Sequence, residues 1–225
     1  MNLQQILNEI KKNANTKNIQ QMIRFGISPR KTFGVKVPFL RQLGKKIGKN
    51  HDLAKRLWQE GYRETQILAS IIDETEKVTW QQVKNWISDF NYWEICDQCV
   101  MNLFEKLPFC WKKCVYLAED EREFFRRTGF VLMARFAVSD KKANNENFLL
   151  FFELIKKFAT DERNMVKKAV NWALRQIGKR NLFLRTQALK IAKEILKIEN
   201  KAAKWIAGDA IRELENEKII ARIKN

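Results

Sequence analysis

Four stretches of the chain resemble one another, and their spacing constrains the fold more than any other feature. They read RETQILASII (63–72), RRTGFVLMARF (126–136), KKAVNWALRQI (167–177) and KWIAGDAIREL (204–214). Arg126 and Lys167 are 41 positions apart, and Arg175 and Arg212 are 37 apart. A period near 40 residues is typical of helix pairs that stack into an array.

Composition supports helices throughout. The 225 residues include only 8 Gly and 3 Pro, too few to separate many short strands, and helix-forming residues are abundant. We therefore expect an all-α fold of HEAT-like helical repeats stacked in a curved α-solenoid; a generic helical bundle is the alternative. Residues 1–225 are expected to form a single domain, because no linker or low-complexity segment divides them.

Apolar periodicity places the helices along the chain. The expected ranges are 2–13, 17–25, Val37–Lys49, Asp52–Glu60, Arg63–Glu74, Trp80–Asp89, Tyr92–Leu107, Pro108–Ala118, Phe124–Val138, Asn147–Ala159, Met165–Gly178, Leu182–Leu196 and Lys201–Glu215. The polar stretch GISPRKTFGVKV, which follows the second range, is not expected to continue a helix.

The net charge indicates the kind of partner. A formal charge of +17 attracts polyanions, so nucleic acid is the first partner to consider and an acidic membrane surface a weaker one. No apolar run is long enough to span a membrane. The N-terminal MNLQQILNEIKKNA lacks the apolar core of a signal peptide. We expect a monomer located in the cytoplasm, or in the nucleus of a eukaryote.

Four cysteines allow two interpretations. Cys96 and Cys99 form a CxxC pattern and Cys110 and Cys114 a CxxxC pattern, the kind of spacing that can bind zinc. Both pairs lie in apolar helical contexts, where buried thiols behave as small hydrophobes. We therefore expect no metal and no disulfide.

The segment NYWEICD (91–97) carries the first candidate site. Trp93 and Asp97 are four residues apart and share a helix face. They lie off the apolar stripe formed by Tyr92, Ile95, Cys96, Cys99, Val100, Leu103 and Leu107. An aromatic residue and a carboxylate outside the core suggest contact with a ligand. The alternative is a partly buried tryptophan beside an exposed aspartate.

The stretch 165–179 carries a second candidate. The core stripe comprises Val166, Ala169, Val170, Ala173, Leu174 and Ile177, and leaves Lys168, Trp172, Arg175 and Lys179 on the opposite side. A tryptophan among cations suits nucleic acid, although lysine stems packed over the ring would give the same pattern. Arg127 begins an apolar helix and needs a partner, for which Asp97 is a candidate.

These motifs resemble those of a known family. WxxxD at Trp93 and Asp97, FFRRTGFVLMARF with Arg127, KKAVNWALRQIGKRN with Trp172, and GVKVPFLRQLGK are similar to the DNA alkylation repair (AlkD-like) HEAT-repeat glycosylases. The similarity covers nearly the whole chain.

The resemblance implies a base-excision-repair glycosylase that acts on N3- and N7-alkylated purines in duplex DNA without flipping the base. It implies catalytic roles for Asp97, Trp93, Arg127 and Trp172. The residue types suit that chemistry, because a carboxylate and two indoles can stabilise the positive sugar left by a cationic purine. No cofactor is expected.

DNA-binding positions follow from the resemblance and from the polar face of 165–179. Phe25 stands nearest to an N-terminal tyrosine of the family, a departure that would weaken contact with DNA without removing the chemistry. The expected backbone contacts are Lys36, Arg41, Lys168, Arg175 and Lys179.

Two other function classes stay open. One is a noncatalytic HEAT-repeat binder of damaged or branched DNA, and the other is a protein-interaction scaffold. His51 is the only histidine, which argues against His-based nucleophilic triads. Its place at an expected helix start favours a cap or solvent role.

Overall fold

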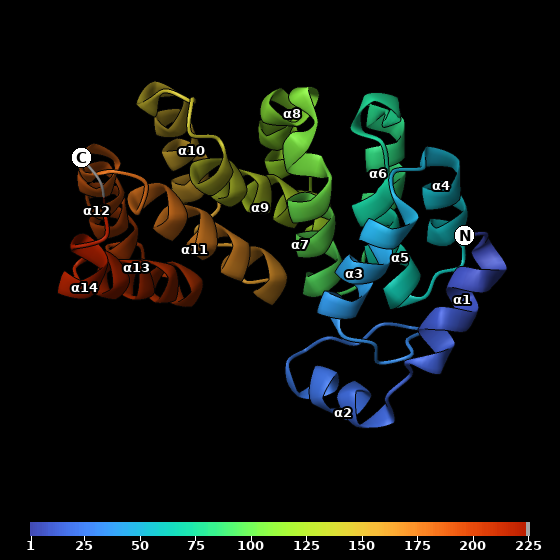
Figure 1. The fold of residues 1–225 in the computed structure, drawn as a ribbon. Coiled ribbons are helices and arrows are strands. Elements are labelled where there is room, and N and C mark those ends of the chain that lie inside the picture. Colours follow the sequence, from blue (N-terminus) through green and yellow to red (C-terminus); the bar gives the residue numbers. More distant parts are fainter. Residues whose placement is uncertain (224–225) are drawn as a thin grey trace. The chain divides into compact units, whose positions relative to one another are not determined.

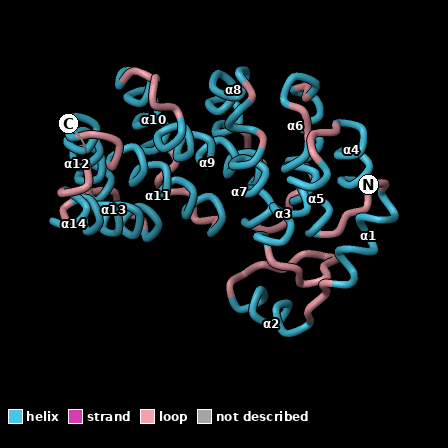
Figure 2. The backbone as a smooth tube through the Cα atoms, in the orientation of Figure 1, coloured by secondary structure: helices cyan, strands magenta, loops and turns pink. Residues whose placement is uncertain are grey.

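The structure is a computed structural model that describes residues 1–223. Helices, turns and loops account for these residues, and no strand occurs among them (Figure 2). The prediction of an all-α protein is therefore confirmed. The chain divides into two compact units, Met1–Pro108 (unit 1) and Phe109–Asn225 (unit 2). That the whole chain acts as a single domain stays a prediction.

The helices follow the predicted order in each unit (Figure 1). Unit 1 contains α1 (Leu3–Lys12), α2 (Thr16–Arg24), α3 (Val37–Ile47), α4 (His51–Gln59), α5 (Arg63–Ile72), η1 (Thr75–Lys77), α6 (Trp80–Ser88), α7 (Trp93–Asn102) and η2 (Phe104–Lys106). Unit 2 contains α8 (Pro108–Glu119), α9 (Glu123–Ser139), α10 (Asn145–Lys157), α11 (Asn164–Gly178), α12 (Leu182–Leu196), α13 (Lys201–Leu214) and α14 (Glu217–Ile220). The two 3₁₀ turns and α14 were not predicted.

One helix is central to the core of each unit. In unit 1, α5 packs against α3, α4 and α7; in unit 2, α11 packs against α9, α12 and α13. All six residues of the predicted α11 stripe are fully buried. Burial of each valine, leucine or isoleucine side chain among them contributes roughly 1.5–3 kcal/mol to folding. No helix in the described chain is long and apolar enough to cross a lipid bilayer.

Side-chain bonds connect one helical repeat to the next at similar sequence separations. They are Arg63 to Glu94 (31 residues), Arg126 to Asp161 (35), Lys156 to Glu194 (38) and Arg175 to Glu213 (38). Ion pairs between a basic and an acidic residue therefore recur at separations of 31–38 residues. The repeat inferred from the sequence is present in the structure.

The end of α7 differs from the prediction. The sequence predicted a helix to Leu107, but Leu103 leaves helical geometry (φ −132°, ψ −60°) and a 3₁₀ turn follows. Leu103, Phe104 and Leu107 are all buried across this break. The Nζ of Lys106 caps the broken end by donating to the Asn102 carbonyl at 2.7 Å.

The four cysteines are free and buried, as the apolar interpretation predicted. Burial raises the pKa of Cys110 to about 12, and it also raises the pKa of Cys99 and of Cys114. Such thiols stay protonated at neutral pH, which makes them weak ligands and weak nucleophiles. Among the described residues, no cluster of three or more His, Cys, Asp or Glu side chains has a metal-binding arrangement.

Polar bonds, rather than apolar burial, attach α2 to unit 1. None of its residues is buried. The Asn15 N–H donates to the Phe33 carbonyl at 2.8 Å, and the Asn18 amide donates to the Gly34 carbonyl at 2.9 Å. Gly34 has φ +74°, and a Cβ there would lie 2.2 Å from the Asn15 carbonyl oxygen, so only glycine fits. The connection between Arg24 and Val37 is not helical, as predicted.

Candidate nucleic-acid interface

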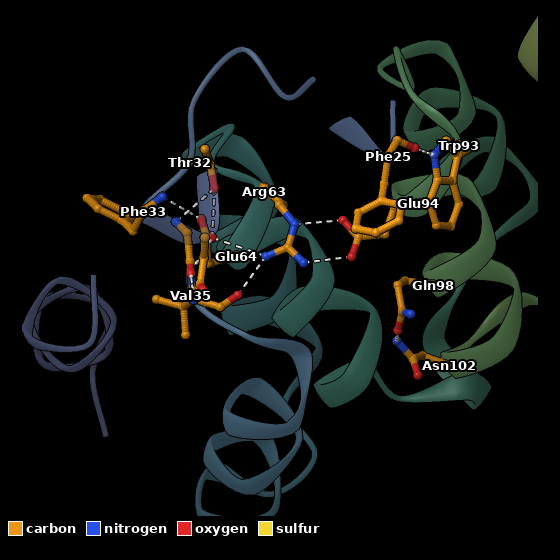
Figure 3. Close-up of polar contacts among 12 residues, drawn as sticks. Phe25, Thr32, Phe33, Val35, Arg63, Glu64, Trp93, Glu94, Gln98 and Asn102 are labelled. Carbon is orange, nitrogen blue, oxygen red and sulfur yellow. Dashed lines mark hydrogen bonds and ion pairs between the residues drawn. The ribbon is translucent and has the colours of Figure 1, made fainter. Parts of the chain in front are cut away.

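Trp93 and Asp97 begin the candidate interface in unit 1. Asp97 is 8% exposed and Trp93 is half-buried, so the alternative of an exposed aspartate is wrong. The Trp93 indole N–H donates to the Phe25 carbonyl at 2.9 Å, while the Phe25 ring is 74% exposed (Figure 3). The apolar stripe predicted for this region, from Tyr92 to Leu107, is buried throughout.

A buried salt bridge fixes the start of α7 beside Trp93. Arg63, only 2% exposed, donates from Nε and Nη2 to the two carboxylate oxygens of Glu94 at 2.6 and 2.7 Å (Figure 3). Burial alone would lower the pKa of Arg63, but bonding to Glu94 and the nearby Glu64 outweigh it and raise that pKa. Two-point contact between planar groups fixes orientation as well as distance.

Glu64 extends this salt bridge to the loop that precedes α3. Its carboxylate accepts the Thr32 hydroxyl at 2.8 Å, the Phe33 N–H at 3.0 Å and the Val35 N–H at 3.1 Å (Figure 3). Arg63 Nη1 also donates to the Val35 carbonyl at 2.7 Å. We call Arg63, Glu64 and Glu94 the Arg63 network; it connects α5, the loop and α7.

The Arg63 network was not predicted from the sequence. Arg63 and Glu64 entered the predictions only in a repeat motif and at the start of the expected helix Arg63–Glu74, and Glu94 only as a residue between Trp93 and Asp97. The available signal was an Arg-Glu pair at the start of a helix whose next eight residues are mostly apolar. Charges beside so apolar a run need partners inside the protein.

Arg127 lies near the start of α9 in unit 2. It is 4% exposed, and its Nη1 donates to the Met165 carbonyl at 2.7 Å. Two residues later, a Cβ at Gly129 would lie 2.4 Å from the backbone nitrogen of Ala118, so the absence of a side chain lets α8 and α9 approach closely. A guanidinium held at the edge of this tightly packed helix has little freedom to reorient.

Trp172 lies half-buried on α11. With its oxygen turned towards them, the Gln176 amide accepts the Trp172 indole N–H at 3.0 Å and Lys179 Nζ at 3.2 Å. Trp172, Gln176 and Lys179 therefore share one face of the helix. The predicted face of α11 is confirmed as lying outside the core, but the tryptophan is only partly accessible.

Arg175 and Lys179 have carboxylate partners that were not predicted. Both donate to Glu213 of α13, and Arg175 Nε also lies 3.5 Å from Asp209. Burial alone would raise the pKa of Glu213, but hydrogen bonds from Lys179 and Arg175 lower it below its ordinary value. These cations would have to exchange a carboxylate for a phosphate in order to bind DNA.

The remaining predicted DNA-binding residues are exposed. Lys36 precedes α3 and Arg41 lies within it, both in unit 1, and Lys168 lies on α11 in unit 2. The predicted catalytic residues fall two to each unit, with Trp93 and Asp97 in unit 1 and Arg127 and Trp172 in unit 2. Their assignment as functional residues stays a prediction.

His51 differs from its predicted cap or solvent role. The cap of α4 is Asn50, whose side chain accepts the Leu53 N–H at 2.9 Å. The His51 side chain is 14% exposed, and its Nδ1 lies 2.7 Å from the fully buried Asp73. Gln82 donates to the other Asp73 oxygen at 2.6 Å. His51 therefore connects the start of α4 to the end of α5.

Comparisons with known proteins agree with this helical architecture. A solved structure of a new family of proteins related to the HEAT-like repeat DNA glycosylases, with affinity for branched DNA structures, superposes with a TM-score of 0.79 at 19% identity, covering 94% of this chain and 95% of that one. This match confirms the HEAT-like fold.

Two further structures are matched less well. An engineered protein gives a TM-score of 0.41 at 14% identity, covering 96% of this chain and 99% of that one. A designed armadillo repeat protein in complex with the peptide (KR)4 gives 0.35 at 13% identity, with 95% of each chain covered. No curated protein matches the sequence.

A family model gives the most direct assignment. The model described as DNA alkylation repair enzyme matches residues 6–214, which is nearly all of the sequence. The match agrees with the resemblance found through Trp93, Asp97, Arg127 and Trp172. The chain therefore belongs to the DNA alkylation repair enzyme family.

Proposed function

We propose that this protein is a DNA glycosylase that removes N3- and N7-alkylated purines from duplex DNA by hydrolysis of the N-glycosidic bond. The observation that carries the proposal is a buried carboxylate, Asp97, one turn from a half-buried tryptophan, Trp93, in a member of the DNA alkylation repair family. The +17 charge of the chain favours a polyanionic substrate.

The chemistry assigned to Asp97 follows from the charge of the lesion. Alkylation at N3 or N7 makes the purine cationic and a good leaving group, so no acid is needed to protonate it. Its departure leaves positive charge on the sugar. A carboxylate out of bulk water interacts more strongly with that charge than an exposed one does, and it can also orient the attacking water.

The two tryptophans and Arg127 supply the other roles. The π faces of Trp93 and Trp172 can stabilise positive charge on the deoxyribose, by about 0.5–2 kcal/mol each. Arg127 would hold a phosphate at the lesion. The family resemblance further implies excision without base flipping, in contrast to the usual strategy of enzymes that modify bases.

A second candidate is a noncatalytic protein that binds branched DNA. The structure with a TM-score of 0.79 is described as having affinity for branched DNA, and it covers nearly all of this chain. A fold that binds junctions can use the same basic surface without any glycosidic chemistry. Under this alternative, Asp97 would be a buried structural acid.

Release of free 7-methylguanine from methylated duplex DNA, measured beside binding to unmodified and branched DNA, tests the two candidates. The glycosylase predicts base release that Asp97→Asn lowers by about a hundredfold or more while DNA binding is kept. Asp52→Asn is the matched control, because it removes the same charge from an exposed position in unit 1.

The outcomes separate the candidates. Base release by Asp97→Asn at the wild-type rate would remove Asp97 from the chemistry. Binding to branched DNA without base release would favour the second candidate. If the protein bound no DNA at all, the protein-interaction scaffold would be the remaining function class.

A further inference from the structure

We propose that a basic cavity in unit 2 binds the phosphodiester groups of a DNA strand, beyond the nucleotide placed at Trp172. The inference rests on the proposed function, since it requires DNA as the ligand. The cavity has a volume of about 690 Å³ and is lined by Ala137, Val138, Lys141, Gln176, Lys179, Arg180, Asn181 and Arg222.

The charge of the lining points to an anion. Four of the eight lining residues are cations and none is acidic. Lys141 and Arg222 are exposed, so solvent reduces their mutual repulsion in the unbound protein. Lys179 is already bonded to Glu213, so an anion inside the cavity would interact mainly with Lys141, Arg180 and Arg222.

Arg180 is fixed in position at the cavity wall. Its Nη1 donates to the Ala137 carbonyl at 3.0 Å and its Nη2 to the Ala143 carbonyl at 2.9 Å. A guanidinium has five N–H donors, so these two bonds leave others for a ligand. Its Cζ also lies 4.6 Å from the centre of the Phe148 ring. A donor group ordered before binding loses little entropy when an anion arrives.

The N-terminus of α12 adds a second positive element. Asn181 lines the cavity and caps this 15-residue helix, accepting the Leu184 N–H at 2.9 Å. The first turn of a helix carries partial positive charge and free N–H groups, which favour phosphate. The N-terminus of α12, which begins beside the lining residue Asn181, therefore adds a partial positive charge to that of the lining cations.

The position of the cavity on α11 favours a nucleic-acid strand over a free phosphate. Gln176 and Lys179 line it and share one helix face with Trp172, to which Gln176 is bonded. Arg180 follows Trp172 by eight residues, which is roughly 12 Å along the axis of α11 at a rise of 1.5 Å per residue. One DNA strand advances about 3.4 Å per nucleotide. A strand following α11 would thus reach the cavity about three to four nucleotides from Trp172.

The test neutralises the two exposed cavity cations in Lys141→Gln/Arg222→Gln. Each lost phosphate contact should reduce the steepness of log K plotted against log salt concentration by about 0.9. At 0.1 M salt this corresponds to a loss of affinity of roughly eightfold. The double variant should bind a duplex of about 20 base pairs up to roughly sixtyfold more weakly. Lys112→Gln/Lys201→Gln is the control, with the same charge change at exposed positions outside the cavity.

The outcomes separate this inference from the proposed function. A cavity variant whose salt slope equals that of the control overturns the inference, while base release by wild type would still support the glycosylase. Wild-type protein that binds no DNA overturns both. Loss of pyrophosphate binding in the cavity variant, with DNA affinity equal to the control, would identify a site for small phosphates and overturn the strand assignment.

Discussion

Helices α7 and α11 each present a tryptophan, but the two side chains are held in different ways. Trp93 on α7 donates to a main-chain carbonyl, and the next residue belongs to the buried Arg63 network. Trp172 on α11 bonds to the side chain of Gln176, and the cations near it pair with Glu213 at partly exposed positions.

The difference separates two uses of charge. Buried charges at α7 are costly to separate, so they fix geometry and contribute little to the surface potential. Partly exposed pairs at α11 contribute little to stability, so their cations can exchange partners. The ion pair at the start of α7 therefore positions residues, whereas the pairs on α11 present cations that a polyanion can attract.

The largest effect is expected for Arg63→Met. It leaves Glu94 and Glu64 buried without their cation, which should lower the free energy of unfolding by about 3–5 kcal/mol. Arg122→Met is the matched control, because Arg122 also bonds both oxygens of one carboxylate, that of Asp120, but with a side chain 59% exposed. The control should lose no more than about 1 kcal/mol.

Urea-induced unfolding of each variant measures both changes. Equal losses for Arg63→Met and Arg122→Met would show that burial does not distinguish the two ion pairs, and the contrast between the units would fail.

A smaller effect is expected when each indole N–H is removed. Trp93→Phe leaves the Phe25 carbonyl without its donor and should cost about 1 kcal/mol in unfolding free energy. Trp172→Phe should cost less, because the Gln176 side chain can rotate towards another donor. Urea unfolding curves of Trp93→Phe and Trp172→Phe compare the two losses of unfolding free energy, because both variants remove the same indole atoms. A larger loss of unfolding free energy for Trp172→Phe would contradict the expectation.

For Arg175→Ala the expected change is mainly in binding. Affinity should fall similarly for all DNA sequences, and the salt slope should drop by about one unit, since one phosphate contact is lost. Arg212→Ala serves as control, because Arg212 is an exposed cation on α13 that pairs with Asp209. Fluorescence anisotropy at several salt concentrations measures the slope. A loss that depends on base sequence would indicate base reading instead.

The smallest effect concerns pH. Because hydrogen bonds lower the pKa of Glu213 in the folded protein, its stabilisation is present above the ordinary value of 4.5 and is lost as pH falls through the lower folded value. Glu213→Gln should remove that part of the acid sensitivity, by under about 1 kcal/mol. Unfolding free energies at pH 7 and pH 3 measure it; an unchanged pH dependence would show that the pair contributes nothing.

Local periodicity predicted the core faces of both helices. The buried residues of α7 and α11 recur at helical spacing, so the sequence alone indicated which residues face inward. Periodicity also placed Asp97 outside the stripe, but it could not predict that Asp97 is 8% exposed. Burial of an off-stripe residue depends on neighbouring helices, which a local pattern does not specify.

Ion-pair partners were harder to predict, because they lie in the next repeat. Glu94 is 31 residues from Arg63, and Glu213 is 38 residues from Arg175. The second pair is close to the period seen in the sequence, since the offset of 37 pairs Arg175 with Arg212, the residue next to Glu213. The first pair lies further from that period, so only the three-dimensional structure identifies it.

The attachment of α2 through polar bonds has a consequence for adaptability. Because α2 has no fully buried residue, releasing it from unit 1 would break hydrogen bonds that water can replace and would uncover only half-buried apolar side chains, Ile19 and Met22. The helix and the exposed Phe25 ring can therefore reposition on ligands of different width for the loss of these contacts and of the Trp93–Phe25 bond.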